Sequence, residues 1–247
     1  MKTYRTATLA RCVGVHPNTV RLYEALGLIP QPARMENGYR AFTELHAAHM
    51  RLARLAFQIE VLQNGLRKKI VLMVKTAATG DYDAAIDLTR EYIAQVQREL
   101  EGAREAIDSV RHLLSGAPCE KAPSLRRSEA AEALHLSIDT LRNWEMNGLM
   151  TVRRRANGYR VYSPDDIRRL RIIRALRCAN YSLEAILRLL TALDADPEVD
   201  IAAALNTPAP GSDILSACDR LIVSLQGAER NARLLLVLLE EMKVRFS

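Results

Sequence analysis

The sequence contains few aromatic residues and no long apolar run. Aromatic residues make up 5% of the 247 residues, with one Trp and three Phe. No stretch reaches the roughly 18 uncharged apolar residues of a membrane-spanning helix, and residues 1–5 lack the apolar segment of a signal peptide. We therefore expect a cytoplasmic protein that does not contact a membrane.

Cysteine is also scarce, and several catalytic motifs are missing. The four cysteines lie far apart and form no Cys-x-x-Cys pair, which predicts reduced thiols rather than a disulfide framework or a zinc knuckle. The sequence contains no Gly-rich phosphate loop, no His-Glu-x-x-His motif and no nucleophile elbow. We therefore expect neither an enzyme nor a resident cofactor.

Positive charge is concentrated in two blocks of a chain whose net charge is +6. Residues 1–56 contain eight Lys and Arg against three acidic residues, and residues 125–190 contain thirteen Arg against seven acidic residues. Two basic blocks of this kind are typical of modules that neutralise nucleic-acid phosphates. Two solvated basic surfaces without a ligand are the alternative.

The chain contains an internal repeat. Residues 18–28 (NTVRLYEALGL) align with residues 139–149 (DTLRNWEMNGL), and residues 37–42 (NGYRAF) align with residues 157–162 (NGYRVY). The second copy is one residue shorter between the two blocks, which indicates a surface loop there. The sequence therefore encodes the same small domain twice.

Each repeat has the pattern of two helices joined by a tight turn and followed by a hairpin. In the first repeat Gly14 permits the turn, and Pro17 lies where the first turn of a helix tolerates proline. The Asn-Gly pairs at 37–38 and 157–158 favour a hairpin, because both residues can adopt positive φ. Ala, Leu, Arg and Glu are abundant, which predicts a mainly α fold. The helix pairs and the hairpins that follow them predict two winged helix-turn-helix domains.

Polar residues mark the expected starts of further helices. The second repeat has a capping signal for a fourth helix, whereas the matching region of the first repeat, residues 57–78, has none. The predicted caps are Thr6, Thr43, Ser128, Ser137, Ser163 and Ser182.

A long helix with a seven-residue apolar period is predicted after each repeat. The first has one row of Ile86, Ile93, Leu100, Ile107 and Leu114 and a second row of Val96, Ala103 and Val110. The other has rows of Ile214, Leu221, Ala228, Leu235 and Met242, and of Cys218, Leu225, Ala232 and Leu239. This pattern predicts two coiled-coil helices paired antiparallel, with packing onto a globular core as the alternative.

These signals divide the chain into consecutive segments. We expect winged domains at 1–78 and 128–193, coiled-coil helices at 79–115 and 212–247, a linker at 116–127, and an acidic loop rich in Pro and Gly at 194–211.

The two repeats resemble the MerR family of bacterial transcription regulators. Residues 21–28 and 37–42 are similar to the family patterns Arg-Tyr-Tyr-Glu-x-x-Gly-Leu and Asn-Gly-Tyr-Arg-x-Tyr, and residues 142–145 and 157–162 match them again. The first aromatic residue of the Tyr-Tyr pair is replaced by Leu22 in one repeat and by Asn143 in the other. Any contact that this residue makes in the family is therefore in doubt here.

The resemblance implies that the second helix of each domain enters the major groove of double-stranded DNA and that the wing contacts phosphates. Packing in the core is the alternative for Tyr23 and Trp144, because aromatic residues at helical spacing usually face inward. The implied DNA-binding residues are Asn18, Thr19, Arg21, Tyr23, Tyr39 and Arg40 in the first repeat, and Asp139, Thr140, Arg142, Trp144, Tyr159 and Arg160 in the second.

Family members bind DNA as two-fold dimers, distort the operator and act with RNA polymerase at the promoter, which implies a protein associated with the bacterial nucleoid. Because this chain has two copies of each part, we expect a monomeric pseudo-dimer that binds an asymmetric two-part operator. A homodimer with four domains is the alternative arrangement. An architectural or recombination accessory protein without an effector is the alternative function.

Some members of the family bind metals through cysteines near the coiled-coil ends. Antiparallel pairing would bring Cys119 towards Cys218, with His112 nearby, and two thiolates and an imidazole can bind a soft metal. Cys218 also occupies a seam position where a small buried hydrophobic residue is ordinary. We therefore expect no metal, with these three residues as the candidates to test.

Overall fold

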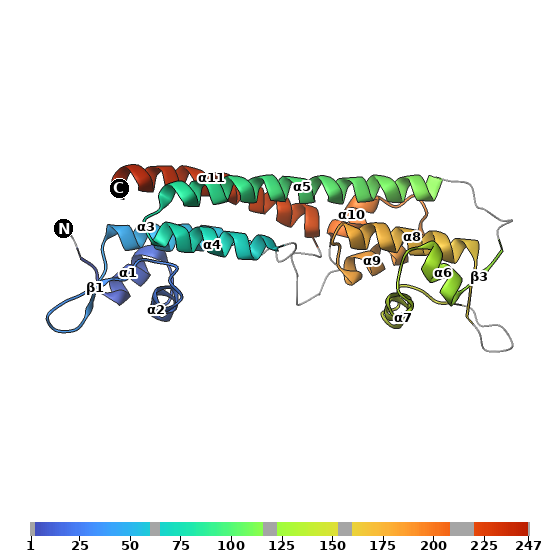
Figure 1. Cartoon of the computed structure of the whole chain (residues 1–247), viewed down its shortest axis with the longest axis horizontal. Helices are drawn as coiled ribbons and strands as arrows, with labels where there is room; N and C mark the ends of the chain where they lie inside the picture. The colour runs from blue at the N-terminus through green and yellow to red at the C-terminus, as the bar shows by residue number, and fades with distance from the viewer. Residues whose placement is uncertain (1–2, 60–64, 116–122, 153–159, 208–219, 247) are drawn as a thin grey trace. The chain divides into compact units, whose positions relative to one another are not determined.

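A computed structural model describes residues 3–59, 65–115, 123–152, 160–207 and 220–246 (Figure 1). The predicted mainly α fold is confirmed: within these ranges the strands form two short antiparallel pairs, and the rest of the regular structure is helical. Two compact units make up the chain. Unit 1 comprises residues 1–98 and 224–247, and unit 2 comprises residues 99–223.

Unit 1 contains the first repeat and the end of the chain. Its elements are α1 (Thr6–Val13), α2 (Pro17–Ala25), β1 (Ala33–Arg34), β2 (Arg40–Ala41), α3 (Glu44–Ala56), α4 (Leu66–Ala78), the first half of α5 (Tyr82–Ser115) and most of α11 (Leu221–Phe246).

Unit 2 contains the second half of α5 and the second repeat. Its other elements are β3 (Leu125–Arg126), α6 (Arg127–Ala133), α7 (Ile138–Met146), β4 (Val161–Tyr162), α8 (Pro164–Cys178), α9 (Leu183–Ala195) and α10 (Ile201–Asn206), followed by the first turn of α11.

The core residues of the two domains occupy matching positions of the repeat. Val20 and Leu141 are buried at the same place in the two second helices, and Phe42 and Tyr162 are fully buried beside the two wings. The same correspondence holds for five further buried pairs: Leu9 and Ala130, Ala10 and Ala131, Val13 and Leu134, Leu28 and Leu149, and Ile29 and Met150. The repeat is therefore a repeat of packing as well as of sequence.

The turn between the first two helices uses different residues in the two domains. Gly14 has φ 66° and closes α1 through a left-handed conformation that glycine adopts without strain. His135 lies at the matching position with φ 49°. A side chain in this region costs of order 1 kcal/mol, so the second domain makes the same turn with local strain.

Each wing is a short antiparallel pair. In unit 1, β1 pairs with β2, Gly38 at the tip of the hairpin has φ 78°, and Tyr4 forms a bridge to Phe42. In unit 2, β3 pairs with β4 through Leu125 and Tyr162, the positions that match Tyr4 and Phe42. The Asn-Gly pair at 157–158 lies outside the described residues, so the predicted tip of the second wing is not described.

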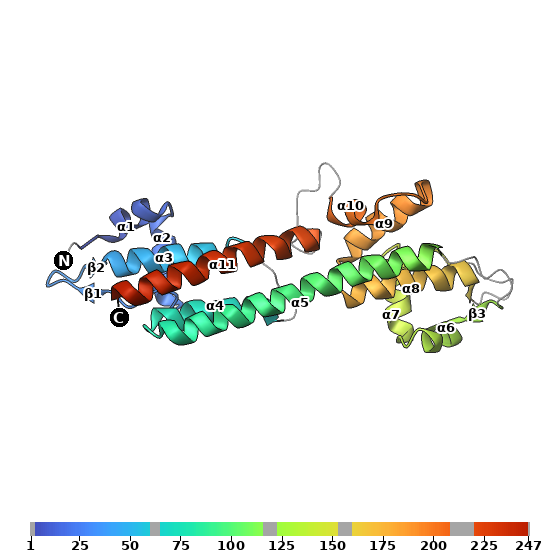
Figure 2. The ribbon, with the colours of Figure 1, turned by 90° about the horizontal axis from the view of Figure 1, so that it is seen from above.

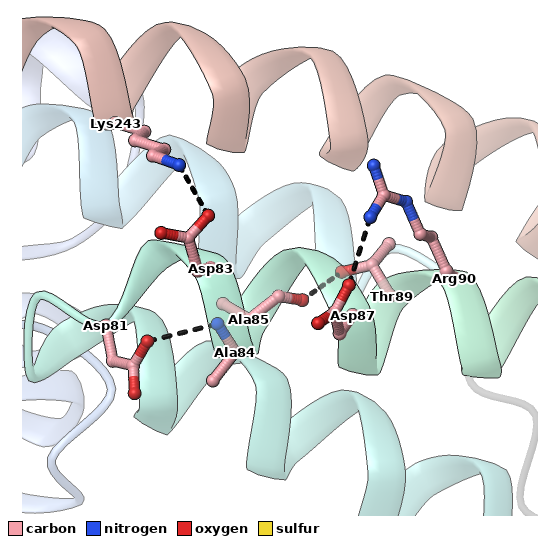
Figure 3. Close-up of polar contacts among 8 residues, drawn as sticks. All are labelled: Asp81, Asp83, Ala84, Ala85, Asp87, Thr89, Arg90 and Lys243. Carbon is pink, nitrogen blue, oxygen red and sulfur yellow. Dashed lines mark hydrogen bonds and ion pairs between the residues drawn. The ribbon is translucent and has the colours of Figure 1, made fainter.

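The two long helices pair antiparallel within unit 1. Lys243 at the end of α11 contacts Asp83 at the start of α5, with 2.5 Å between Nζ and Oδ1 (Figure 3). Nearer the middle, Nε2 of Gln97 donates to Glu229 over 2.9 Å. These contacts run in opposite directions along the two helices, as the sequence predicts. In Figure 2, α11 lies beside α5 along this stretch.

The predicted seam of α11 is confirmed where it is described, and that of α5 is confirmed at six of its eight residues: Ile86, Val96, Leu100, Ala103, Ile107 and Val110. In α11 both predicted rows are buried from Leu221 to Met242, while Ile214 and Cys218 lie outside the described residues. In α5, Ile93 and Leu114 are only half-buried. The more continuous buried stripe in unit 1 is Tyr82, Ala85, Thr89, Tyr92 and Val96. The hydroxyl of Thr89 remains satisfied because it donates to the carbonyl of Ala85 over 2.8 Å (Figure 3).

α11 also packs against α3 in an antiparallel direction (Figure 2). Asn231 donates to Gln58 over 3.3 Å, and Arg245 lies 4.0 Å from Glu44. A Cβ placed on Gly227 would lie 2.4 Å from Cδ1 of Ile59, so the absence of a side chain allows this close approach. α11 therefore packs against both α3 and α5 and contributes buried residues to unit 1.

Several local features differ from the sequence predictions. The N-caps of α1 and α6 are Arg5 and Arg126, not Thr6 and Ser128, whereas Ser137, Ser163 and Ser182 cap their helices. The N-cap of α4 is Gly65, which has φ 78° and no side chain to accept a capping hydrogen bond. The region predicted as an acidic loop contains α10, which forms because the carboxylate of Asp200 accepts from two backbone N–H groups.

No helix among the described residues is long and apolar enough to cross a membrane.

Candidate nucleic-acid interface

The second helix of each domain, α2 or α7, presents an exposed polar face. Asn18 and Arg21 are exposed on α2, where Nη1 of Arg21 donates to Oδ1 of Asn18 over 2.9 Å. Asp139 and Arg142 are exposed at the matching positions of α7. The neighbouring Thr19 and Thr140 are half-buried. Both helices therefore offer an arginine to solvent, beside an amide in one and a carboxylate in the other.

The aromatic residues of these helices face inward. Trp144 is only 5% exposed and belongs to the core of the second domain, so its side chain is not placed to contact DNA. Tyr23 is half-buried, packs against the core of the first domain, and lies edge-on to Phe57 with 6.2 Å between ring centroids. Burial raises the pKa of Tyr23. Of the two interpretations of these aromatic residues, packing holds fully for Trp144 and largely for Tyr23.

The first wing exposes an aromatic ring among arginines. Tyr39 is 61% exposed, and the guanidinium of Arg5 lies 5.7 Å from the centroid of its ring. Arg34 donates to the carbonyl of Gly38 over 3.1 Å. Tyr159, the matching residue of the second wing, lies outside the described residues.

An ion pair links the wing to the second helix in both domains. Nε of Arg40 donates to Glu24 over 2.6 Å, and Nε of Arg160 donates to Glu145 over 2.8 Å. The two carboxylates are largely buried, with 7% and 9% of the side chain exposed, whereas about a third of each arginine side chain remains exposed. Each arginine can therefore position the wing through one N–H group and present others to an anion.

Glu145 makes contacts that Glu24 does not have. Nη2 of Arg127 donates to both of its oxygens, over 3.0 and 2.9 Å, and the hydroxyl of Tyr162 donates to it over 2.5 Å. Burial, followed by the hydrogen bond to Glu145, raises the pKa of Tyr162 and keeps this donor protonated. In the first domain the matching positions are Thr6 and Phe42, which cannot make these contacts.

Two family models match the chain, one in each repeat. Residues 5–42 match the model of the MerR family regulatory protein, and residues 125–193 match that of the MerR HTH family regulatory protein. The chain carries two MerR-family domains.

Curated relatives of these MerR-family domains match over short segments. A mercuric resistance operon regulatory protein of Bacillus cereus is 49% identical over 41 residues, which cover 17% of this chain and 31% of the relative. The HTH-type transcriptional regulator CueR of Escherichia coli is 39% identical over 51 residues, which cover 21% of this chain and 38% of the relative. The chain thus spans about a third of the length of these relatives. No solved structure matches it.

Sequence reasoning placed Arg171 and Arg174 on the polar face of a helix, but it assigned no DNA-binding role to the four arginines at matched positions of the third helix in the two MerR-family domains. Arg51 and Arg54 of α3 match Arg171 and Arg174 of α8 when the repeat alignment is continued beyond the wing. Arg54 donates to the carbonyl of Val13 in the helix-turn-helix, and Arg174 lines a groove of about 700 Å³ between α7 and α8. The alignment of residues 37–42 with residues 157–162, carried 12 residues further, pairs all four.

The candidate metal ligands are not brought together by the described structure. Cys119 and Cys218 lie outside the described residues, and His112 is exposed on α5. In the part of the chain that the structure describes, no three His, Cys, Asp or Glu side chains gather as they would around a metal ion.

Replacing Glu145 with Ala is expected to destabilise unit 2 by about 2–3 kcal/mol, because it leaves Arg127 and Arg160 without their shared carboxylate. Glu24→Ala removes a single ion pair, and we expect a loss of about 1 kcal/mol in unit 1. The fluorescence of Trp144, the single Trp of the chain, follows the unfolding of the second domain. Glu132→Ala, at an exposed position of α6, is the control. A loss at Glu145 no larger than at Glu132 would contradict the assigned role.

Proposed function

We propose that this protein is a sequence-specific, DNA-binding transcriptional regulator whose two MerR-family domains bind a two-part operator and distort the DNA. The observation that carries this proposal is the pair of matched recognition helices, α2 and α7. Both present an exposed arginine on a polar face at the same position of the repeat. An α-helix with such a face fits the major groove, where arginine can bind guanine through two hydrogen bonds.

The two recognition helices differ enough to prefer different half-sites. Asn18 of α2 is replaced by Asp139 in α7, and Leu22 by Asn143, and all four residues are exposed. Asparagine can pair with adenine, whereas a carboxylate accepts from cytosine and repels phosphates. The operator is therefore proposed to have two unequal halves.

The seam between α5 and α11 supports a single chain acting as its own pair. Family members bring two domains together through antiparallel long helices, and here α11 of the second repeat packs in unit 1 against α5 and α3. We propose that one chain therefore occupies both halves of one operator, with RNA polymerase as the partner at the promoter.

DNA distortion without regulation is the alternative, since architectural proteins use similar contacts to the DNA backbone. The names of the matched relatives, a resistance operon regulator and a transcriptional regulator, favour regulation. The location proposed with this function is the bacterial nucleoid.

Arginine truncation on each recognition helix tests the two-part site. Arg21→Ala is expected to weaken binding about ten- to hundredfold and to relax sequence preference in one half of the operator, and Arg142→Ala in the other half. The measurement is affinity for a set of duplexes that carry single base changes, at constant near-physiological salt, because phosphate contacts depend steeply on salt.

The matched control is Arg104→Ala, which removes an exposed arginine of α5 outside both recognition helices. It is expected to change affinity less than threefold, without changing preference in either half. If Arg21→Ala and Arg142→Ala relaxed the same half, or neither, the proposal of two separate recognition helices would be wrong.

A further inference from the structure

α11 has a second apolar face, opposite to the seam that packs in unit 1. Four large side chains on it are exposed: Val223 is 47% exposed, Leu234 56%, Val237 54% and Val244 89%. The buried rows of the same helix lie on the opposite side, and the helix contacts α3 and α5. Exposed apolar residues scattered singly are ordinary, but a row on one helix face indicates a contact surface.

The spacing of this face is that of a coiled coil. Arg230, Leu234, Val237, Glu241 and Val244 follow one another at alternating intervals of four and three residues. On an α-helix these positions fall within an arc of about 80°. We call these five residues the outer face of α11.

Four of the five residues of the outer face are complementary to one another in an antiparallel arrangement. When two copies of α11 are placed side by side in opposite directions, with Leu234 facing Val237 of the second copy, Arg230 faces Glu241 of the second copy. The two-fold axis repeats both pairs. In antiparallel coiled coils such layers place an a position opposite a d position. Arg230 and Glu241 are both exposed, and among the described residues neither forms an ion pair.

We propose that the outer face of α11 binds the same face of a second copy of this chain. Figure 1 shows α11 on the side of unit 1 opposite to α1 and α2, so this contact leaves the recognition helix of unit 1 uncovered. The surface is short and contains two charges, which favours an association that is weaker than that of an obligate dimer. Two chains joined in this way bring four DNA-binding domains together, so a pair of operators can be bridged.

Sedimentation of the full chain tests the proposal. We expect the wild-type protein to pass from its 27.7 kDa monomer towards twice that mass as the concentration rises from about 1 to about 200 μM, the range of a small interface. Val237→Glu is expected to remain monomeric throughout. The control is Leu72→Glu on α4, which changes a residue of similar exposure, 52%, outside the outer face and should leave the association unchanged.

Exchanging the charges of Arg230 and Glu241 tests the antiparallel register of the two helices, and recovery in the double variant separates this effect from a loss of folding. Arg230→Glu places two acidic side chains opposite each other at both ends of the interface, and Glu241→Arg places two basic ones there. Each single variant is expected to weaken dimerisation about tenfold or more, because like charges that face each other are destabilising. The double variant Arg230→Glu with Glu241→Arg is expected to recover wild-type association.

A wild-type protein that stays monomeric at every concentration overturns the proposal. So does a dimer that Val237→Glu leaves intact, since the copies then meet through another surface, such as an exchange of α11 between chains. Loss of association in both single variants without recovery in the double variant overturns the antiparallel register. None of these results depends on DNA binding, so the two-part operator is tested separately.

Discussion

Truncating Leu239 to Ala is expected to destabilise unit 1 by about 3 kcal/mol. Leu239 is fully buried on the inner face of α11. Replacing a buried leucine with Ala removes transfer free energy and leaves a cavity, which together cost about 2–5 kcal/mol. The loss falls on the first domain because α11 packs against α3 and α5 there.

Hydrogen exchange at the backbone amides of Leu239→Ala shows which helices lose stability. We expect faster exchange in α3 and the first half of α5, with little change in α9 of unit 2. The control is Leu234→Ala on the same helix, where the side chain is 56% exposed, and we expect it to change the free energy of unfolding by less than about 0.5 kcal/mol. Equal effects of the two truncations would show that α11 does not complete the first domain.

Acidification is expected to destabilise unit 1 through His49. This side chain is fully buried on α3, stacks on Tyr82 and lies 3.3 Å from its hydroxyl. Its Nδ1 has no hydrogen-bond partner among the described residues. Burial, with a smaller contribution from His46, lowers the pKa of His49 from 6.5 to about 4. Burial lowers the pKa of His46 as well.

The pH window follows from the two ends of this shift. Above pH 6.5 His49 is neutral in both the folded and the unfolded chain, so its contribution to stability does not change with pH there. Between pH 6.5 and about 4 the unfolded chain binds the proton and the folded chain does not, so stability falls as the pH falls. Complete titration across this window costs about 3 kcal/mol. Below about pH 4 both forms are protonated, and the contribution of His49 levels off.

Urea unfolding of unit 1 between pH 7 and 4 measures this effect. His49→Gln keeps a side chain that can accept from the hydroxyl of Tyr82 but does not titrate, and its stability should decline less steeply with acid. His112→Gln, at an exposed position of α5, is the control. A His49→Gln variant with the wild-type pH dependence would exclude His49 as the titrating group.

The features predicted well from the sequence are those that depend on neighbouring residues or that occur in both repeats. The matched blocks around Val20 and Leu141 gave the two helix-turn-helix domains, and the heptad rows of α11 were confirmed wherever they are described. Serine caps were identified correctly at Ser137, Ser163 and Ser182, because their hydrogen bonds lie within one turn of the chain.

Features that depend on distant segments were not predictable from local patterns. The carboxylate of Glu145 accepts from Arg127, 18 residues away in sequence, and no local pattern indicates that pair. The inward orientation of Trp144 depends on the packing of the whole domain. α10 was missed because proline and glycine near residues 208–211 obscured a short helix that a single carboxylate, that of Asp200, begins.

The measurement that tests the central claim most directly is selection of bound duplexes from a randomised DNA library at near-physiological salt, followed by sequencing. If one chain binds through two different MerR-family domains, the enriched site has two unequal halves, and Arg21→Ala and Arg142→Ala each erase the preference in a different half. A symmetric site would contradict that account and favour two identical domains from two chains. The absence of any enriched sequence, with binding that disappears as salt rises, would contradict sequence-specific regulation itself.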